Sequence, residues 1–389
     1  MQSHPLPQAV LGEGDASRSD AGGEGPHAPT HFLFIVAHNG APIWGGAERA
    51  TALLLAGLRE RGHRVLLLCN EAEVARRAED LGVPTEIARL GGDAALHHAA
   101  AMGRRLRALK PDAFIVGTFR KLFLASLAAR IGGVRRVVAR VGLESDTPRS
   151  AKYRFVLARW VDAVVVNASR MRPAFAALPG WSDARVPVIH NGVTVPAADG
   201  SMRAELGIPA DAPVVGTVAR LARQKRIDRL LHSLALLPPE THCVVAGGGG
   251  RLERLRTLAD ELGIGARVHF VGHRDDTGTV LATLDLFVTA SDSEGLSNAM
   301  LEALACGVPV VSTPVSGAED ALEPLPDGRG PGVVAGWEPE ELAAAIRFIL
   351  NDPELRARMS EAARERAEER FGVAGMLDRW ERVLRGDAA

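Results

Sequence analysis

Two carboxylates eight positions apart are the side chains best suited to chemistry in this chain. Glu294 lies in a short polar loop, and Glu302 lies in the Ala- and Leu-rich segment that follows it. A carboxylate accepts two hydroxyl donors at once, which suits the diol of a sugar or a ribose. If a helix begins between the two acids, its unpaired N–H groups and its dipole favour an anion. The pattern predicts a ligand with phosphate in the middle and hydroxyl groups at both ends, as in a nucleotide-sugar.

Two cations are expected to meet the same phosphate. Arg220 and Lys225 follow the apolar run 214–218 and precede a helix that Ile227 anchors. At the end of a strand they would neutralise a diphosphate leaving group as its charge grows. Glycines 247–250 also follow a strand, but they lack the Gly-x-Gly-x-x-Gly spacing of a dinucleotide site. We interpret this turn, with Gly248 at its centre, as a place where the ligand passes close to the backbone.

The elements that position these residues alternate regularly. Apolar runs typical of buried parallel strands begin at Phe32 and recur through both halves of the chain, with helical patterns between most of them; they include 65–68, 113–116, 137–139, 163–166, 186–189, 214–218, 243–246, 268–271, 286–288, 308–311 and 332–335. This alternation predicts an α/β protein with doubly wound parallel sheets, whose functional loops lie at the carboxyl ends of the strands.

The length and the linker composition predict two domains. A chain of 389 residues suits two domains of roughly 150 to 200 residues each. We expect a disordered tail over 1–29, a first Rossmann-like domain over 30–195, a linker over 196–203, a second Rossmann-like domain over 204–370, and a terminal helix within 371–389.

The composition is that of a globular protein without a membrane span. Hydrophobic residues make up 47% of the chain and charged residues 24%, and no apolar run approaches the roughly 18 residues of a spanning helix. The three cysteines lie far apart in apolar segments, so we expect buried thiols in a reducing, cytoplasmic setting; they are Cys69, Cys243 and Cys306.

Basic side chains are concentrated in one stretch. Between Ala101 and Arg172 there are sixteen basic residues against four acidic ones, within a chain of net charge −1. Two interpretations stay open: a surface that meets anionic lipid or an acidic acceptor, or a solvated Arg-rich face. Nothing in this pattern indicates a nucleic-acid partner.

The donor-site residues resemble those of a known family. Glu294, Gly295, Glu302 and the segment 305–311, Ala-Cys-Gly-Val-Pro-Val-Val, are similar to the signature of retaining family 4 glycosyltransferases, and Arg220 and Lys225 have the spacing of that family's phosphate clamp. The resemblance extends from about Phe32 to Leu384. It implies two facing Rossmann-like domains (the GT-B type, glycosyl transferases group 1), of which the first binds the acceptor and the second binds the nucleotide-sugar donor. It also implies transfer of a sugar from a nucleotide-diphosphate sugar to a hydroxyl acceptor with retention.

The resemblance also implies roles for individual residues. Glu302 would bind the ribose, and Glu294 would bind the sugar hydroxyls. Arg274 would either stack on the nucleotide base or point outward. The diphosphate would lie against Arg220, Lys225 and the backbone at Leu296, Ser297 and Asn298, with Gly45, Gly46 and Gly248 close by. No metal or cofactor is expected beyond the nucleotide-sugar, and the C-terminal helix would cross back to the first domain.

One family feature is missing from the first domain. Many relatives carry a histidine after the fourth strand, near the reacting sugar, whereas this chain has Gly142 at about that position. His38, Glu144 and Asn191 are the tentative first-domain site residues. The acceptor would be a sugar, a lipid-linked glycan or another hydroxyl compound, in cell-envelope polysaccharide, lipopolysaccharide or glycolipid assembly at the inner membrane face.

Two other functions use the same architecture. A nucleotide-sugar 2-epimerase would need further acid and base groups in the first domain, and none stands out in the sequence. A non-catalytic subunit that only binds nucleotide-sugar is less consistent with an intact clamp and both glutamates. The nucleotide, the sugar and the linkage leave no trace in the sequence.

Overall fold

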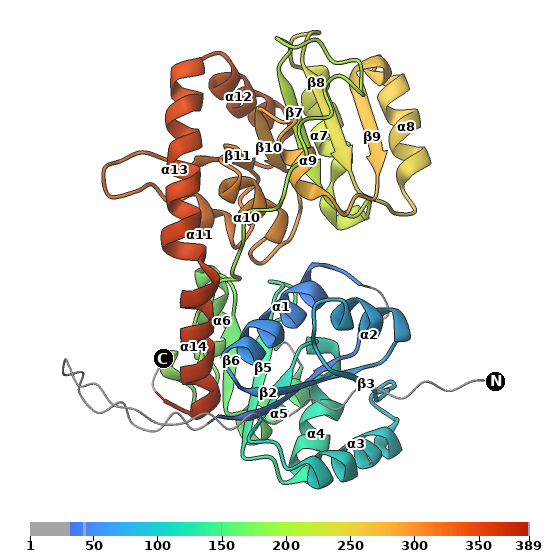
Figure 1. The fold of residues 1–389 in the computed structure, drawn as a ribbon, viewed down its shortest axis with the longest axis vertical. Coiled ribbons are helices and arrows are strands. Elements are labelled where there is room, and N and C mark those ends of the chain that lie inside the picture. The colour runs from blue at the N-terminus through green and yellow to red at the C-terminus, as the bar shows by residue number, and fades with distance from the viewer. Residues whose placement is uncertain (1–31, 42–43, 149, 388–389) are drawn as a thin grey trace, which may run out of the picture. The chain divides into compact units, whose positions relative to one another are not determined.

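Parallel strands alternate with helices to form two sheets in this computed structural model, which describes residues 32–41, 44–148 and 150–387 (Figure 1). Each sheet has six strands, in the order β3-β2-β1-β4-β5-β6 and β12-β11-β10-β7-β8-β9. Counted within its own half, each sheet has the same order, 3-2-1-4-5-6, which is that of the doubly wound nucleotide-binding fold. The predicted fold class is therefore confirmed.

The first sheet comprises β1 (Phe34–Asn39), β2 (Arg64–Cys69), β3 (Thr85–Ile87), β4 (Ala113–Val116), β5 (Arg136–Val141) and β6 (Ala163–Val166). Its helices are α1 (Gly46–Glu60), α2 (Ala72–Glu79), α3 (Leu96–Leu109), α4 (Leu122–Gly132), α5 (Ala151–Trp160) and α6 (Arg172–Ala176). Three short 3₁₀ turns complete this half: η1 (Phe119–Lys121), η2 (Ser169–Met171) and η3 (Asp183–Arg185).

The second sheet comprises β7 (Val214–Val218), β8 (His242–Ala246), β9 (Val268–Gly272), β10 (Leu286–Thr289), β11 (Val310–Ser312) and β12 (Gly332–Val334). Its helices and the C-terminal ones are α7 (Ile227–Ala235), α8 (Leu252–Glu261), α9 (Thr277–Leu281), α10 (Asn298–Ala305), α11 (Ala318–Leu322), α12 (Pro339–Leu350), α13 (Pro353–Phe371) and α14 (Val373–Arg385). The 3₁₀ turns here are η4 (Arg223–Lys225) and η5 (Gly265–Arg267).

The central strands are buried on both faces. Every residue of β1 and of β4 is buried, as the continuous apolar runs predict for strands covered by helices on both sides. Each sheet lies between two hydrophobic clusters, one on either face. The cores fix the strand positions, and the loops at the carboxyl ends of β1, β7 and β10 are then held in place for a site.

Two elements differ from the predictions. The run 186–189 was expected to be a strand, but it contributes only an isolated bridge between Val188 and Val166. Pro187 has no amide hydrogen, so the pairing with β6 cannot continue as a regular ladder. Conversely, β3 was not predicted, because an edge strand of three residues with a polar sequence has too little apolar periodicity to detect.

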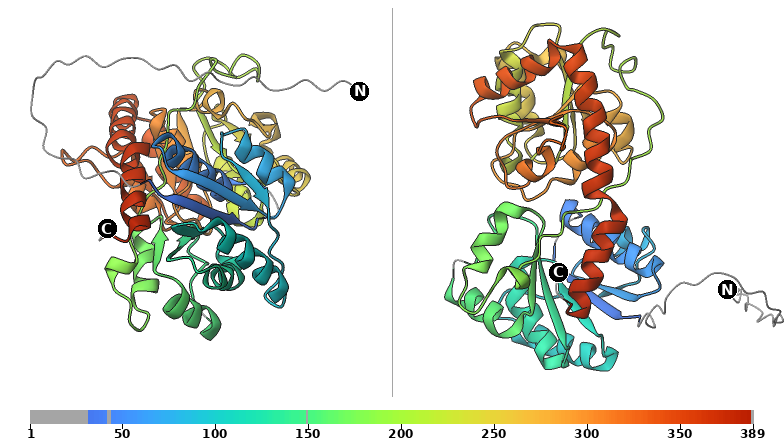
Figure 2. Two further views of the ribbon diagram at one scale, coloured as in Figure 1. Left: turned by 60° about the horizontal axis from the view of Figure 1, so that its bottom comes forward. Right: turned by 90° about the vertical axis from the view of Figure 1, so that its left-hand side faces the viewer.

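Helices α13 and α14 follow one another with only Gly372 between them (Figure 2). The side chains of Leu377, Trp380 and Val383 on α14 belong to the hydrophobic cluster that covers one face of the first sheet. Helix α13 instead packs against α10 and contributes Phe371 to a cluster of the second sheet. Helix α14 therefore packs on the first half of the chain, and helix α13 packs on the second.

Other expectations concern the termini, the thiols and the membrane. The predicted disordered tail over 1–29 lies outside the described residues. Cys69 and Cys243 are buried as expected, and burial raises the pKa of each thiol to about 12, whereas Cys306, just after the end of α10, is only half-buried. Within the described ranges, no helix combines the length and the apolar character that crossing a bilayer requires.

Candidate donor site

One of the two predicted cations, Lys225, contacts one of the two predicted carboxylates, Glu294. Lys225 ends the turn η4 after β7, and its ammonium group forms an ion pair with the Glu294 carboxylate in the loop after β10. Glu294 is only 7% exposed, and the same oxygen accepts a hydrogen bond of 2.9 Å from the Ser291 hydroxyl. Neighbouring parallel strands bring these loops together, because β7 and β10 are adjacent in the sheet.

The two loops are also joined through Gln224. The amide N–H of Asp292 donates to the Gln224 carbonyl at 2.9 Å, and the Gln224 side-chain amide donates to the carbonyl of Ser293. These contacts fix the turn that leads into α10, which begins at Asn298 after Ser297. The first-turn N–H groups of an α-helix have no partner within the helix, so this end of α10 presents donors that suit a phosphate.

The second predicted carboxylate has a partner that the sequence did not reveal. Glu302 lies on α10, is 7% exposed, and forms an ion pair with the guanidinium of Arg49 from α1. The side chain of Arg49 is 43% exposed, so it can leave the carboxylate without unfolding α1. Arg49 comes three residues after the glycine pair at the start of α1, and that position was the only signal available in the sequence.

A hydrogen-bond network, exposed at Gly46 and buried at Arg140, connects the first glycine loop to α10. Asn298 donates from its side-chain amide to the carbonyl of Gly46 at 2.9 Å, and its side-chain oxygen accepts from Asn191 at 2.7 Å. Asn191 in turn accepts from Arg140 at 3.0 Å. Burial lowers the pKa of Arg140 to about 10, and nearby Glu48 only partly offsets this effect. At neutral pH the guanidinium remains charged.

Close packing explains the glycine that follows Glu294. A Cβ atom on Gly295 would lie 2.3 Å from the carbonyl oxygen of Gly142 and 2.3 Å from the side-chain oxygen of Asn167. Gly142 follows β5 and Asn167 follows β6, so loops of the first sheet contact the Glu294 loop. The backbone carbonyl of Gly142, at the position expected for the family histidine, therefore excludes a side chain at position 295, whereas a Cβ on Gly142 itself would lie 3.9 Å from the Asn167 side-chain nitrogen, in ordinary contact.

Three predicted donor residues are not drawn into these contacts. The exposed side chain of Arg220 forms no hydrogen bond or ion pair with another described residue, although it stands beside Leu221, whose N–H donates to the Gly248 carbonyl at 2.9 Å. Arg274 pairs with Asp276, with Nε at 2.8 Å from the carboxylate.

The glycines after β8 form a tight turn. A Cβ on Gly247 would meet the backbone carbonyl oxygen of Ala219, and a Cβ on Gly249 would meet that of Leu221.

The tentative first-domain residues lie in three different environments. Asn191 belongs to the network described above, whereas Glu144 accepts a hydrogen bond of 2.6 Å from the Ser316 hydroxyl. His38 is fully buried at the end of β1, with Nε2 at 3.2 Å from the side-chain oxygen of Asn70. Burial lowers the pKa of His38 to about 4, so this imidazole is neutral at physiological pH.

The site offers two carboxylates, Glu294 before the start of α10 and Glu302 within its second turn. Each carboxylate pairs with one cationic side chain, and each pair is a contact between side chains only. A ligand with a diphosphate and two hydroxylated rings can replace both partners: its phosphates attract the cations, and its hydroxyl groups donate to the carboxylates.

Comparisons with known proteins define the class. The model of the family described as "Glycosyl transferases group 1" matches residues 199–366, and that of "Glycosyltransferase Family 4" matches residues 44–195. The topology of the two parallel sheets and these two family matches together identify the fold as GT-B. The chain belongs to the family 4 glycosyltransferases.

Curated relatives match part of the chain. The lipopolysaccharide core biosynthesis glycosyltransferase LpsE of Rhizobium meliloti is 34% identical over 226 residues, which span 58% of this chain and 65% of the relative. The D-inositol 3-phosphate glycosyltransferase of Mycobacterium bovis is 36% identical over 200 residues, which span 49% of this chain and 41% of the relative. The matches thus cover less than two thirds of either relative.

Solved structures match the fold over most of both chains. Anabaena Alr3699/HepE, crystallised with UDP and glucose, has a TM-score of 0.79 at 23% identity and covers 91% of this chain and 100% of its own. A glycosyltransferase from Rickettsia africae has a TM-score of 0.77 at 16% identity, covering 91% and 98%. At these identities the likeness concerns the fold.

Proposed function

We propose that this protein transfers a sugar from a nucleoside-diphosphate sugar to a hydroxyl acceptor, with retention of the anomeric configuration and without a metal ion. The observation that carries the proposal is the ion pair between Lys225 and the buried Glu294, placed before the start of α10, with Glu302 one turn inside that helix. Membership of the family supports the same activity.

In the proposed reaction, Glu302 accepts hydroxyl groups of the ribose and Glu294 those of the transferred sugar. Lys225, Arg220 and the N–H groups at the start of α10 bind the diphosphate, and their positive charge stabilises it as the bond to the anomeric carbon breaks. The acceptor oxygen forms its bond on the face that the phosphate leaves, and the acceptor proton passes to a departing phosphate oxygen. These cationic groups supply the charge that a metal ion would otherwise provide.

We propose UDP as the nucleotide of first choice, because the structurally similar Anabaena protein was crystallised with UDP and with UDP-glucose. A melting-temperature screen of uridine, guanosine and adenosine diphosphates tests this choice directly. Stabilisation by guanosine or adenosine diphosphate alone would contradict it.

The activity is tested by incubating the pure protein with nucleotide-sugars, with and without hydroxyl acceptors. Nucleoside diphosphate released only with an acceptor supports transfer. An epimerised sugar would instead indicate a 2-epimerase, and binding without turnover a non-catalytic subunit. Proton NMR of the product gives the anomeric configuration, and unchanged turnover in EDTA is expected for a reaction without a metal ion.

We further propose that the acceptor belongs to cell-envelope glycan or glycolipid assembly at the cytoplasmic face of the membrane. The name of the Rhizobium relative and the basic residues between Ala101 and Arg172 support this setting. Several of those residues have internal partners, including Arg105 with Glu86 and Lys152 with Asp93. Flotation with liposomes is the test: binding that does not increase with anionic lipid would refute a membrane role.

A further inference from the structure

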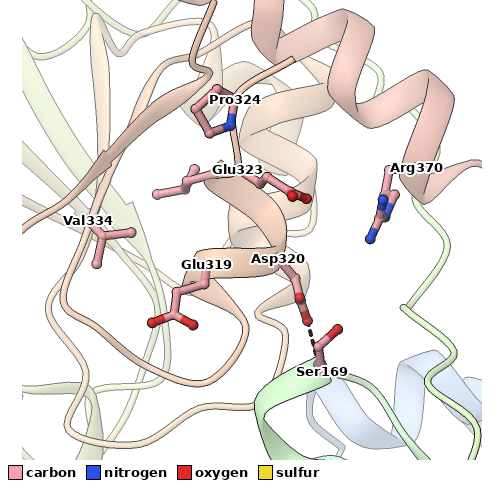
Figure 3. Close-up of a pocket in the computed structure, with 8 residues that line it drawn as sticks. Ser169, Glu319, Asp320, Glu323, Pro324, Val334 and Arg370 are labelled. Atoms are coloured by element: carbon pink, nitrogen blue, oxygen red, sulfur yellow. Dashed lines mark hydrogen bonds between the residues drawn. The ribbon is translucent and has the colours of Figure 1, made fainter. Parts of the chain in front are cut away.

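Two adjoining cavities lie outside the group of donor-site residues. The larger has a volume of about 460 Å³ and three carboxylates in its lining, which consists of Ser169, Glu319, Asp320, Leu322, Glu323, Pro324, Val334 and Arg370 (Figure 3). The smaller has a volume of about 340 Å³ and is lined by Ser169, Arg172, Val188, His190, Arg370 and Arg379. The two cavities share Ser169 and Arg370.

The smaller cavity is strongly cationic. Three of its six lining residues are arginines and none is acidic. Among the described residues, the side chains of Arg370 and Arg379 form no hydrogen bond and no ion pair within 4 Å. Arg172 donates to the carbonyl of Val186 at 3.1 Å, and its nearest carboxylate, Asp183, is 3.7 Å away. Three guanidinium groups around one hollow, two of them without partners, are suited to bind a phosphate.

A buried imidazole in the same lining has an unused nitrogen. His190 is 5% exposed, and its Nε2 lies 3.2 Å from the carboxylate of Asp320. Its other ring nitrogen, Nδ1, is buried and has no hydrogen-bond partner among the described residues. Buried polar atoms are nearly always hydrogen-bonded in native structures. Nδ1 is covered by protein atoms, so a ligand would reach it only after a local shift of the lining, and the arginines carry the inference.

The larger cavity complements this charge. Asp320 is already engaged, because its carboxylate accepts from the Ser169 amide at 2.6 Å and contacts His190. Burial alone would raise its pKa, but these hydrogen bonds together lower it, so the group is ionised at neutral pH. The carboxylates of Glu319 and Glu323 are more exposed. Glu323 already forms an ion pair of 2.8 Å with Arg366, whereas the nearest cation to Glu319, Arg170, is 3.9 Å away, so Glu319 is the most available acceptor for hydroxyl groups.

We propose that these two cavities together bind a small phosphorylated polyol, such as a sugar phosphate. Arg172, Arg370 and Arg379 take the phosphate, and the carboxylates of the larger cavity accept the hydroxyl groups. Each volume lies within or close to the range of small-molecule sites. The lining contains none of the residues assigned to the nucleotide-sugar, so the inference does not depend on the proposed transfer reaction.

The test uses the full chain and measures binding by titration calorimetry. The probes are glucose 6-phosphate, glycerol 3-phosphate and inorganic phosphate, each titrated with saturating UDP present to occupy any donor site. We expect a sugar phosphate to bind more tightly than inorganic phosphate. Replacing one arginine removes a charge-assisted hydrogen bond, so Arg379→Gln and Arg370→Gln should each weaken binding roughly tenfold or more. The matched control is Arg382→Gln, an exposed arginine on the same helix as Arg379.

Among the described residues, Arg370 and Arg379 form no side-chain hydrogen bond or ion pair within 4 Å, and Arg370 interacts with the carboxylate of Glu323 only at longer range. Both variants should therefore melt within about a degree of the unmodified protein, and agreement between them guards against an effect of a single substitution. Several outcomes would overturn the proposal. These are no binding of any probe, an equal loss in Arg382→Gln, and binding abolished by UDP. Binding of anionic vesicles alone, with no soluble probe bound, would assign the arginines to lipid headgroups and would also overturn it.

Discussion

Replacing Lys225 by methionine separates the structural role of its ion pair from its catalytic role. The change leaves the Glu294 carboxylate, only 7% exposed, without its cationic partner. Removing one partner of a buried pair costs about 3–5 kcal/mol. Here Lys225 is 20% exposed and the Ser291 hydroxyl still donates to Glu294, so we expect a smaller loss, about 2 kcal/mol. For domains of this size, that lowers the melting temperature by about 4–8 °C.

The effect on turnover should be larger. Loss of one group that stabilises developing charge costs about 3 kcal/mol, so kcat should fall by about 10². The double variant Lys225→Met/Glu294→Gln leaves no unpaired charge. Its melting temperature should therefore recover most of the loss, which assigns that loss to the unpaired carboxylate. Low turnover of Lys225→Met at a temperature where this single variant is fully folded then distinguishes a catalytic cation from one that only stabilises the fold.

The assays are scanning calorimetry and steady-state release of nucleoside diphosphate. Arg223→Met is the matched control, since Arg223 begins the same turn, is exposed and has no side-chain partner among the described residues. The control should keep both its melting temperature and its turnover. If Lys225→Met retained kcat within threefold, Lys225 would have no part in the reaction. If its stability were unchanged, the ion pair would not exist in the free protein.

Three further predictions follow from the site. Gly295→Ala places a Cβ 2.3 Å from Asn167, so donor turnover should fall at least tenfold, whereas Gly375→Ala, with nothing within 4 Å, should be silent in the same assay. His38 has its pKa lowered to about 4, so its contribution to stability is complete above pH 6.5 and is lost as the pH falls toward 4; at full loss this amounts to about 3 kcal/mol. Urea unfolding should show that loss, and a His38→Gln variant with an equally steep pH dependence would contradict it. Arg49→Gln frees its carboxylate partner on α10, so the KM for the donor should change severalfold. The melting temperature should fall by less than in Lys225→Met, because Arg49 is 43% exposed and solvent already screens this pair; identical donor kinetics would show that Arg49 is not part of the donor site.

Sequence alone was sufficient for the elements that depend on local pattern. Continuous apolar runs identified most of the strands, and glycines at fixed offsets identified the turns, because burial on two faces and left-handed or crowded backbone restrict the residue types allowed. The same local logic failed at 186–189, where the apolar pattern was that of a strand but Pro187 lacks the amide that a ladder needs. It also failed at the short polar strand β3.

The residues proposed for the donor site were chosen from their spacing and from the family resemblance, but their partners in the fold could not be predicted. Lys225 and Glu294 are 69 positions apart, and Arg49 and Glu302 are 253 apart. No periodic pattern connects residues at such separations, because their contact depends on which strands become neighbours and on how the first glycine loop meets α10. The sequence determined which side chains we propose to bind a diphosphate and two sugar rings. Only the tertiary structure decided which cation neutralises which carboxylate, because an ion pair forms between groups that are close in space, whatever their distance along the chain.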